Sequence, residues 1–580
     1  MLSIFHFRSS PTTLPSRDRN RRSKVVRKEQ MRLTTGIACI AFAFSAVTAS
    51  FLHAQQACED LKNLNLDHVT ITSAVSADAG PLKQATGSPI KPPPINLPAH
   101  CEVTGVARPT SDSEIDFLLW LPPASAWNGK YMQAGNGGWA GTISPASLIG
   151  PLFLGYAISA TDDGHHASGM MPDASFAVGH PEKLIDFGYR AVHETTLASK
   201  AILRAYYGKP GSHDYFVGCS DGGREALMEA QRYPEDFDGI IAGAPASHWT
   251  HLLTGALWNE QALKSKPESA IPPAKLPAIQ KAALAQCDAL DGVKDGVIED
   301  PRTCHFDPSV LLCHGADSAD CLTQPQIDAL QKIYSGPKNS ATGEQIFPGF
   351  EPGAEADPSG WGGWIVGPIQ SAFANSFFGQ ALHEDPKWDW HTADLDREVR
   401  LADEKAASVL NSWNPDLRTF RAHGGKLIQY HGWEDAAIPP RDSIDYYEHA
   451  RTFLGSYPDP RPNGGAPIES FYRLFMVPGM QHCGGGQGPS NFGLSAAPSG
   501  SAYTTDADHN IIFALDRWVT QGVAPDRIVA SGTIGSDPKA GVPGTHLTRP
   551  LCVYPAVATY KGQGDTNAAE NFTCVAPPPK

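Results

Sequence analysis

The chain has 580 residues, of which 18% are charged and 41% hydrophobic, a globular composition with room for more than one domain. Its formal net charge is −15, and residues 1–54 hold nine basic but only two acidic side chains, so the rest of the chain carries about −22. This negative balance argues against nucleic acid or an anionic membrane surface as a partner.

The N-terminal segment 1–54 has the pattern of a secretory signal. Basic residues precede an apolar run from Ile37 to Val47, and small residues follow it. The run is too short to span a bilayer, and no later segment is apolar for long enough. We expect translation to start at Met31, cleavage after Ala54, and a secreted or periplasmic protein. A longer basic leader would lead to the same export.

Short apolar runs alternate with helical patterns in two parts of the chain. The runs predict buried strands at 131–134, 156–160, 215–217, 240–242, 427–430 and 475–477. Helices are predicted over 185–206 and 223–232. This alternation is typical of a doubly wound, mostly parallel sheet. It stops in a tryptophan-rich stretch, so we divide the chain into a first core part (55–246), an insertion (247–421) and a second core part (422–580).

The segment Gly218-Cys219-Ser220-Asp221-Gly222 has the G-x-S-x-G pattern of a nucleophile elbow, between a predicted strand and a predicted helix. Glycines suit such a sharp turn, so we interpret Ser220 as a nucleophile. A plain glycine-rich turn is the alternative. The thiol of Cys219 is a rival nucleophile, but an even number of cysteines in an exported chain favours a half-cystine.

Two further residues fit the chain order of serine, acid and histidine that α/β-hydrolases use. Asp435 follows a late predicted strand and is the favoured acid, with Glu434 as the alternative. His482 follows the last predicted strand and is the candidate base. A solvated loop acid and a surface histidine are the simpler interpretations of these positions.

Ester hydrolysis also requires N–H donors for the oxyanion. The N–H of Asp221, after the nucleophile, is the first candidate. A glycine-rich loop at 135–139 follows an early strand and offers Gly137, or next to it Gly138, as the second. The loop could equally be an ordinary tight turn.

Ten cysteines follow the signal segment, an even number that predicts five disulfides. Spacing suggests the local pairs 58–101, 287–304, 313–321 and 552–574, which leaves Cys219 and Cys483, although ten cysteines allow many pairings. If these two are bonded, the backbones of Ser220 and His482 lie within roughly 14 Å of each other. The ten are Cys58, Cys101, Cys219, Cys287, Cys304, Cys313, Cys321, Cys483, Cys552 and Cys574.

The segment 287–297 places three aspartates beside two glycines. Carboxylates and backbone carbonyls on a turning loop suit a hard cation such as Ca²⁺. The spacing is not that of an EF-hand. From these residues alone, two Asp-Gly turns on an acidic surface loop are at least as good an explanation.

Together these residues resemble the tannase and feruloyl esterase family, which includes hydrolases of mono(hydroxyethyl) terephthalate. The resemblance covers essentially the whole mature chain and is most specific at Cys219-Ser220, Asp435 and His482-Cys483. It implies an α/β-hydrolase core with a large inserted lid domain, and a disulfide between those two cysteines. It also implies a structural calcium ion in the lid, held by Asp288, Asp291, Val293, Asp295 and Val297.

The function that the resemblance implies is hydrolysis of aromatic carboxylic esters, of hydroxycinnamoyl or galloyl type, through a Ser-His-Asp triad and an acyl-enzyme. The tryptophans Trp361 and Trp364 either cup the acyl group or belong to the lid core. Hydrolysis of terephthalate monoesters or other esters is the alternative. A calcium-stabilised binding protein without activity is a less favoured one.

Overall fold

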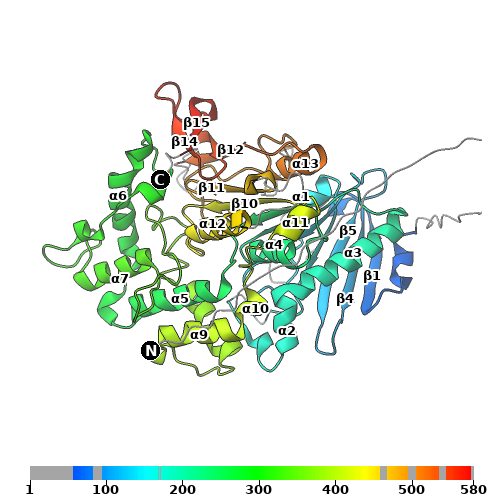
Figure 1. Cartoon of the computed structure of the whole chain (residues 1–580), viewed down its shortest axis with the longest axis horizontal. Helices are drawn as coiled ribbons and strands as arrows, with labels where there is room; N and C mark the ends of the chain where they lie inside the picture. Colours follow the sequence, from blue (N-terminus) through cyan, green and yellow to red (C-terminus); the bar gives the residue numbers. More distant parts are fainter. Residues whose placement is uncertain are drawn as a thin grey trace, which may run out of the picture. The chain divides into compact units, whose positions relative to one another are not determined.

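A computed structural model describes residues 56–82, 95–167, 169, 171–456, 467–493, 504–534 and 544–576, which belong to one compact unit (Figure 1). The predicted signal segment, with its start at Met31 and cleavage after Ala54, lies outside these residues. Within the described ranges, no helix is both long enough and apolar enough to cross a bilayer.

A nine-stranded sheet forms the core, in the order β1-β4-β5-β7-β6-β8-β9-β10-β11. All six predicted strands are present and are mutually parallel. They are β6 (Tyr131–Ala134), β7 (Ala157–Thr161), β8 (Asp214–Cys219), β9 (Gly239–Gly243), β10 (Lys426–Gly432) and β11 (Tyr472–Val477). The mostly parallel sheet predicted from the sequence is therefore confirmed.

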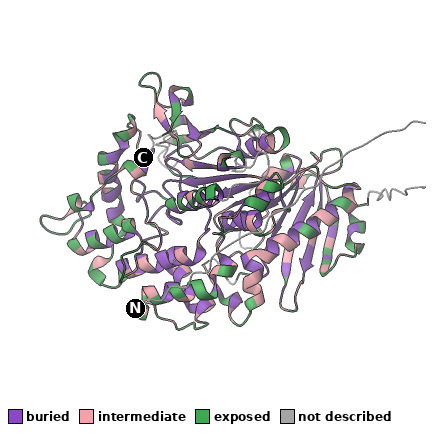
Figure 2. Cartoon of the chain, in the orientation of Figure 1, coloured by how far each residue is buried: buried purple, intermediate pink, exposed green. Residues whose placement is uncertain are grey.

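Three antiparallel strands at one edge of the sheet were missed by the sequence analysis: β1 (Val69–Ala77), β4 (His100–Ala107) and β5 (Ile115–Leu121). β1 exposes serine and threonine side chains between its buried ones, so it lacks a continuous apolar run. In contrast, β6, β7 and β9 are buried at every residue, since helices cover both faces of the parallel part (Figure 2).

Core helices connect the strands and cover the sheet. The helix predicted over 185–206 is interrupted by a π-helical turn at 186–190 and continues as α3. The helix predicted over 223–232 begins two residues earlier, directly after Ser220. The core helices are α1 (Ala146–Phe153), α2 (Pro181–Ile185), α3 (Ala191–Tyr207), α4 (Asp221–Arg232), α12 (Arg441–Ser456) and α13 (Ile511–Gln521).

The expected large insertion lies between β9 and β10 and is drawn mainly in green in Figure 1. Its described residues form helices, loops and isolated bridges. The insertion contacts the core closely, because the Trp139 indole N–H donates to Ser376 Oγ at 3.0 Å and Arg441 pairs with Glu351. Its α-helices are α5 (Trp249–Lys264), α6 (Leu276–Cys287), α7 (Gln324–Ser335), α8 (Ile369–Asn375), α9 (Leu395–Lys405), α10 (Ala407–Leu410) and α11 (Arg418–Ala422).

Short antiparallel pairs complete the described structure: β2 (Gly80–Pro81) with β3 (Asn96–Leu97), β12 (Arg527–Ile534) with β13 (Thr545–Cys552), and β14 (Val557–Tyr560) with β15 (Phe572–Val575). The four local disulfides suggested by the cysteine spacing are formed, and so is the remaining pair that the family resemblance implied. They join Cys58 to Cys101, Cys219 to Cys483, Cys287 to Cys304, Cys313 to Cys321, and Cys552 to Cys574.

Candidate active site

Ser220 occupies a sharp turn between β8 and α4. Its backbone has φ 68° and ψ −121°, a region that residues with a side chain rarely adopt. The turn requires close backbone approach, because a Cβ at Gly218 would lie 2.3 Å from the Gly222 carbonyl oxygen. The G-x-S-x-G glycines therefore allow β8 and α4 to meet, which places the Ser220 hydroxyl at the carboxyl end of the parallel sheet.

Ser220, His482 and Asp435 form one hydrogen-bonded row, although Ser220 and His482 are 262 residues apart in sequence. His482 Nε2 lies 2.9 Å from Ser220 Oγ, and its Nδ1 lies 2.8 Å from Asp435 Oδ2. A carboxylate only accepts hydrogen bonds, so Nδ1 carries the proton and Nε2 is free to accept from the serine hydroxyl. The row thus contains an unprotonated nitrogen facing a hydroxyl.

Asp435 is fixed by its neighbours. Its Oδ1 accepts from the N–H groups of Ala437 (2.8 Å) and Ile438 (2.9 Å), and His431 Nε2 lies 3.2 Å from its Oδ2. Burial raises the pKa of Asp435, but the charge of His482 and hydrogen bonds from His431 and His482 outweigh it, so the pKa lies well below the ordinary value. Asp435 is therefore an ionised, oriented carboxylate.

Glu434, the alternative acid, belongs to a different environment. Burial, followed by the nearby charges of Asp357 and Glu355, raises the pKa of Glu434 well above its ordinary value. One of its carboxyl oxygens is buried without a hydrogen-bond partner among the described residues. The structure thus pairs His482 with Asp435 and leaves Glu434 apart.

The disulfide between Cys219 and Cys483 joins the residue before Ser220 to the residue after His482. The two Cα atoms lie 5.9 Å apart across a sequence separation of 264 residues. Cys219 is therefore a half-cystine rather than a free thiol. The bond ties the serine turn directly to the histidine loop, which helps to hold the 2.9 Å contact between the two side chains.

Removing this disulfide with the pair Cys219→Ala and Cys483→Ala is expected to lower kcat by at least about 10-fold, because misplacement of about 1 Å costs about 100-fold. Stability should fall by about 2–5 kcal/mol. Ester hydrolysis and denaturant unfolding measure the two effects. The control is Cys313→Ala with Cys321→Ala, a pair only 8 residues apart in the insertion. An unchanged kcat in the first variant would show that the bond does not position His482.

The glycine-rich loop lies beside the serine turn. The Gly222 N–H donates to the Asn136 carbonyl at 2.9 Å, and the Asn136 N–H donates to Glu225 Oε2 at 3.0 Å. Asp221 is the first residue of α4, so its N–H has no acceptor within the helix. Gly138 lines the cavity beside Ser220 and Asp221, whereas Gly137 is not among the lining residues.

A buried acidic cluster behind the serine turn was not identified from the sequence. Asp163, Asp221 and Glu225 are all buried close together, and Arg224 donates to Asp221 Oδ1 at 2.5 Å. Burial raises the pKa of Asp221 to about 7, although Arg224 opposes this. Burial and the charge of Glu225 raise the pKa of Asp163 well above its ordinary value. One arginine faces three carboxyl groups, so the cluster favours the protonated, neutral form of Asp163 more than water does.

A cavity opens at Ser220. Trp364 lines it and packs edge-on to His482 with ring centroids 5.4 Å apart, whereas Trp361 is buried in a separate core cluster. Trp361 therefore belongs to the core of the insertion, whereas Trp364 packs against that core and also faces the cavity. The remaining lining residues are mostly apolar: Gly138, Asp221, Ala246, Trp249, Leu252, Leu253, Ala256, Gln370, Phe373, Ala437 and Ile438.

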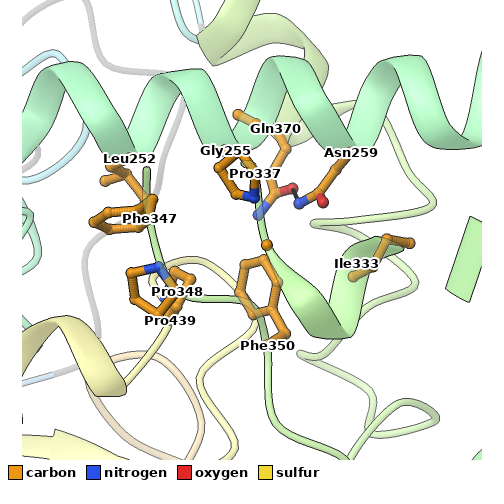
Figure 3. Close-up of a pocket in the computed structure, with 12 residues that line it drawn as sticks. Leu252, Gly255, Asn259, Ile333, Pro337, Phe347, Pro348, Phe350, Gln370 and Pro439 are labelled. Carbon is orange, nitrogen blue, oxygen red and sulfur yellow. Dashed lines mark hydrogen bonds between the residues drawn. The ribbon is translucent and has the colours of Figure 1, made fainter. Parts of the chain in front are cut away.

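A second, smaller cavity shares Leu252, Ala256 and Gln370 with the first (Figure 3). Asn259 donates to the Gln370 side-chain oxygen at 3.0 Å, which fixes the Gln370 amide between the two spaces. Gln370 is thus an oriented polar group in an otherwise apolar wall.

The predicted calcium segment packs against the C-terminal strands. Asp288 accepts from the N–H groups of Asp295 and Gly296, and Arg549 pairs with Asp295 at 2.5 Å. Burial, followed by repulsion from Asp295 and Asp288, raises the pKa of Asp291 to about 6. The segment's three carboxylates do not form a closed ligand cluster among the described residues. Their hard oxygen donors and excess negative charge nevertheless fit a calcium ion.

The same segment lies close to the histidine loop. A Cβ at Gly479, three residues before His482, would lie 3.0 Å from Val297 Cγ1. Val293 packs in a small cluster with Ala558 and Phe572 of the C-terminal strands. The segment therefore joins the insertion to both the histidine loop and the C-terminal part of the chain.

A serine on a tight strand-to-helix turn, with a histidine and an oriented acid following in that chain order, is characteristic of the α/β-hydrolase class. This chain is a carboxylic ester hydrolase of that class. Its sequence matches the family model described as tannase and feruloyl esterase over residues 101–575. The chain belongs to that family, as the sequence resemblance implied.

Individual relatives agree with this assignment. The chain is 45% identical to an uncharacterized esterase of Xanthomonas campestris pv. campestris, over 90% of this chain and 92% of the relative. It is 33% identical to the mono(2-hydroxyethyl) terephthalate hydrolase of Piscinibacter sakaiensis, over 91% of this chain and 93% of that protein. The crystal structure of feruloyl esterase B from Aspergillus oryzae is similar with a TM-score of 0.79 and 29% identity, covering 89% of this chain and 99% of that one.

Proposed function

We propose that the protein is an exported serine esterase that hydrolyses esters with an uncharged aromatic acyl group. The observation that carries the proposal is the hydrogen-bonded triad of Ser220, His482 and Asp435, whose serine lines a cavity with aromatic walls. Export is supported by the five disulfides and by the signal-like N-terminal sequence. The substrate is a small molecule, in keeping with the family.

In the proposed reaction, Ser220 Oγ attacks the ester carbonyl carbon while His482 Nε2 takes the hydroxyl proton. The negative oxygen that forms is held by the N–H groups of Asp221 and of Gly137 or Gly138. His482 then donates its proton to the departing alcohol, which leaves an acyl-enzyme. Water, deprotonated by His482, releases the acid and restores Ser220. Asp435 orients the imidazole and stabilises its charged form throughout.

The preference for an uncharged acyl group rests on the charges around the cavity. Among the described residues that line it, none has a cationic side chain, and Trp249, Trp364 and Phe373 supply flat apolar surface. The acyl group of mono(hydroxyethyl) terephthalate carries a free carboxylate besides the ester. In this cavity the carboxylate would lose its hydration shell without gaining a cationic partner. A phenolic acyl group can instead accept a hydrogen bond from Gln370.

A side-by-side ester panel tests this preference. We expect kcat/KM for methyl ferulate or methyl gallate to exceed that for mono(hydroxyethyl) terephthalate by at least about 10-fold, because an unpaired charge in an apolar site costs more than about 1.4 kcal/mol. Methyl benzoate is the control for ring size alone. Equal or faster hydrolysis of the terephthalate monoester would contradict the proposed acyl preference while leaving the serine mechanism intact.

We also propose that a structural calcium ion is held by side-chain oxygens of Asp288, Asp291 and Asp295 and by carbonyls of Val293 and Val297. Supporting this are the acidic donor set and its position between the insertion and the C-terminal strands. The ion would neutralise the loop and stabilise its fold. It has no step in the hydrolysis, which Ser220 and His482 carry out.

Calcium removal is therefore expected to destabilise the protein. At a concentration about 100-fold above its dissociation constant, the ion should add about 2.7 kcal/mol to the free energy of unfolding, and EGTA should remove that gain. Thermal unfolding with and without calcium measures it. Asp291→Asn should abolish the calcium dependence, whereas Asp320→Asn, at an exposed position of the same insertion, should retain it. A wild-type unfolding curve insensitive to EGTA would refute the site.

A further inference from the structure

Two histidines and one aspartate meet where the first turn of α5 contacts α9, outside the residues that line the cavity. His248 precedes α5, His251 lies in its first turn, and Asp403 lies on α9 (Figure 1 labels both helices). One potential ligand atom from each of the three side chains lies within 4.8 Å of the others. The hydrolysis mechanism uses none of them.

The hydrogen bonds of His251 leave one nitrogen facing a negative charge. Its Nδ1 lies 2.9 Å from the Ile346 carbonyl oxygen, so this nitrogen must carry a proton and donate it. Its Nε2 lies 3.1 Å from Asp403 Oδ2. A neutral His251 would therefore point a lone pair at a carboxylate. A bound cation between the two atoms, or a second proton on the ring, would remove that conflict.

His248 supplies a second nitrogen-bearing ring beside the first. Its ring stacks on His251 with centroids 3.7 Å apart and on Trp413 at 4.6 Å. His248 is half-buried beside these two rings, and one of its nitrogens belongs to the cluster of potential ligand atoms. A second proton on His251 would satisfy only His251 and Asp403, whereas a metal ion would also use His248.

Outer contacts orient these groups in the way typical of metal ligands. Thr250 donates to Asp403 Oδ1 at 2.8 Å, which directs the other oxygen toward His251. The donation from His251 Nδ1 to a backbone carbonyl is the usual outer contact of a metal-bound histidine.

We propose that His248, His251 and Asp403 form a binding site for a transition-metal dication of the Zn²⁺ type. Imidazole nitrogens select Zn²⁺, Co²⁺ or Ni²⁺ over Ca²⁺, so this site differs in chemistry from the acidic segment at 288–297. The side chains of Asp403 and His251 are 42% and 19% exposed, which leaves a route for the ion and room for a water ligand. The ion would fasten α5, which also lines the cavity, to α9.

The test is a metal titration of the full-length protein kept in calcium-containing buffer. We expect one equivalent of Zn²⁺ to bind with a dissociation constant in the micromolar range or tighter, measured by calorimetry, and Co²⁺ to give the visible absorption of a tetrahedral complex. His251→Gln and Asp403→Asn should each weaken binding by at least about 10-fold. Thermal unfolding without added metal shows whether each variant is folded.

A matched control comes from another cluster of the same type, Asp116, Asp162 and His166, where the histidine is mostly exposed. His166→Gln should leave zinc affinity unchanged. Absence of stoichiometric zinc binding would overturn the proposal and identify the His251–Asp403 contact as an ordinary ion pair. Binding that is lost with His166→Gln but retained with His251→Gln would also overturn it.

Discussion

Ser220→Ala is expected to lower kcat for an aromatic methyl ester by about four to six orders of magnitude, because the variant has no atom that can form the acyl-enzyme. The row of hydrogen bonds would lose only its first member, since Asp435 still holds His482 through a 2.8 Å contact. The fold should persist, because alanine removes a single oxygen. Steady-state kinetics and thermal unfolding measure the two outcomes.

The residual rate of this variant is also informative. The N–H group of Asp221 and the glycine loop would remain in place, so weak hydrolysis above the uncatalysed rate is expected. The dissociation constant of the substrate should be nearly unchanged. It can be measured directly, because the inactive variant does not consume the substrate. A Ser220→Ala protein that still hydrolysed methyl ferulate at more than a few per cent of the wild-type rate would contradict the assigned nucleophile.

Asp435→Asn should reduce kcat by about three to four orders of magnitude, because an amide in place of the carboxylate favours the wrong tautomer of His482. The neighbouring residue supplies the matched control. Glu434→Gln changes a carboxyl group that is also buried, but one whose strongest charge interactions are with Asp357 and Glu355. We expect its kcat to stay within a few-fold of the wild type.

Both variants require a stability measurement, because each alters a buried group. Asp435 accepts two backbone N–H bonds that asparagine can still accept through its oxygen, so unfolding should change by only about 1–3 kcal/mol. If Glu434→Gln lost activity and Asp435→Asn did not, the roles of the two acids would be exchanged. Comparable losses in both would indicate general damage to the loop.

Much of this site could be predicted because its signals are local. The glycines at 218 and 222 mark a turn that only small residues permit, and the paired cysteines carry a long-range restraint within the sequence itself. The parallel strands are continuous apolar runs because helices cover both faces of that part of the sheet. These features do not depend on how distant parts of the chain pack.

Other features depend on tertiary contacts and were not predictable. Asp163 and Glu225 are 62 positions apart, and His251 and Asp403 are 152 apart, with no sequence pattern that links them. β1 mixes exposed polar and buried residues, so its place at the sheet edge follows from pairing with β4. Which glycine of the loop faces the cavity also depends on backbone geometry, and the structure favours Gly138 over Gly137 as a lining residue.

The central claim is that Ser220 is a nucleophile activated by His482, which is far from it in sequence but adjacent in space. The most direct test is covalent labelling by a fluorophosphonate, followed by peptide mass mapping. We predict one label per protein, attached to the hydroxyl of residue 220, and prevented by prior reaction with a phenylmethylsulfonyl reagent. Unlabelled protein that still turns over esters, or a label on any other residue, would contradict the account.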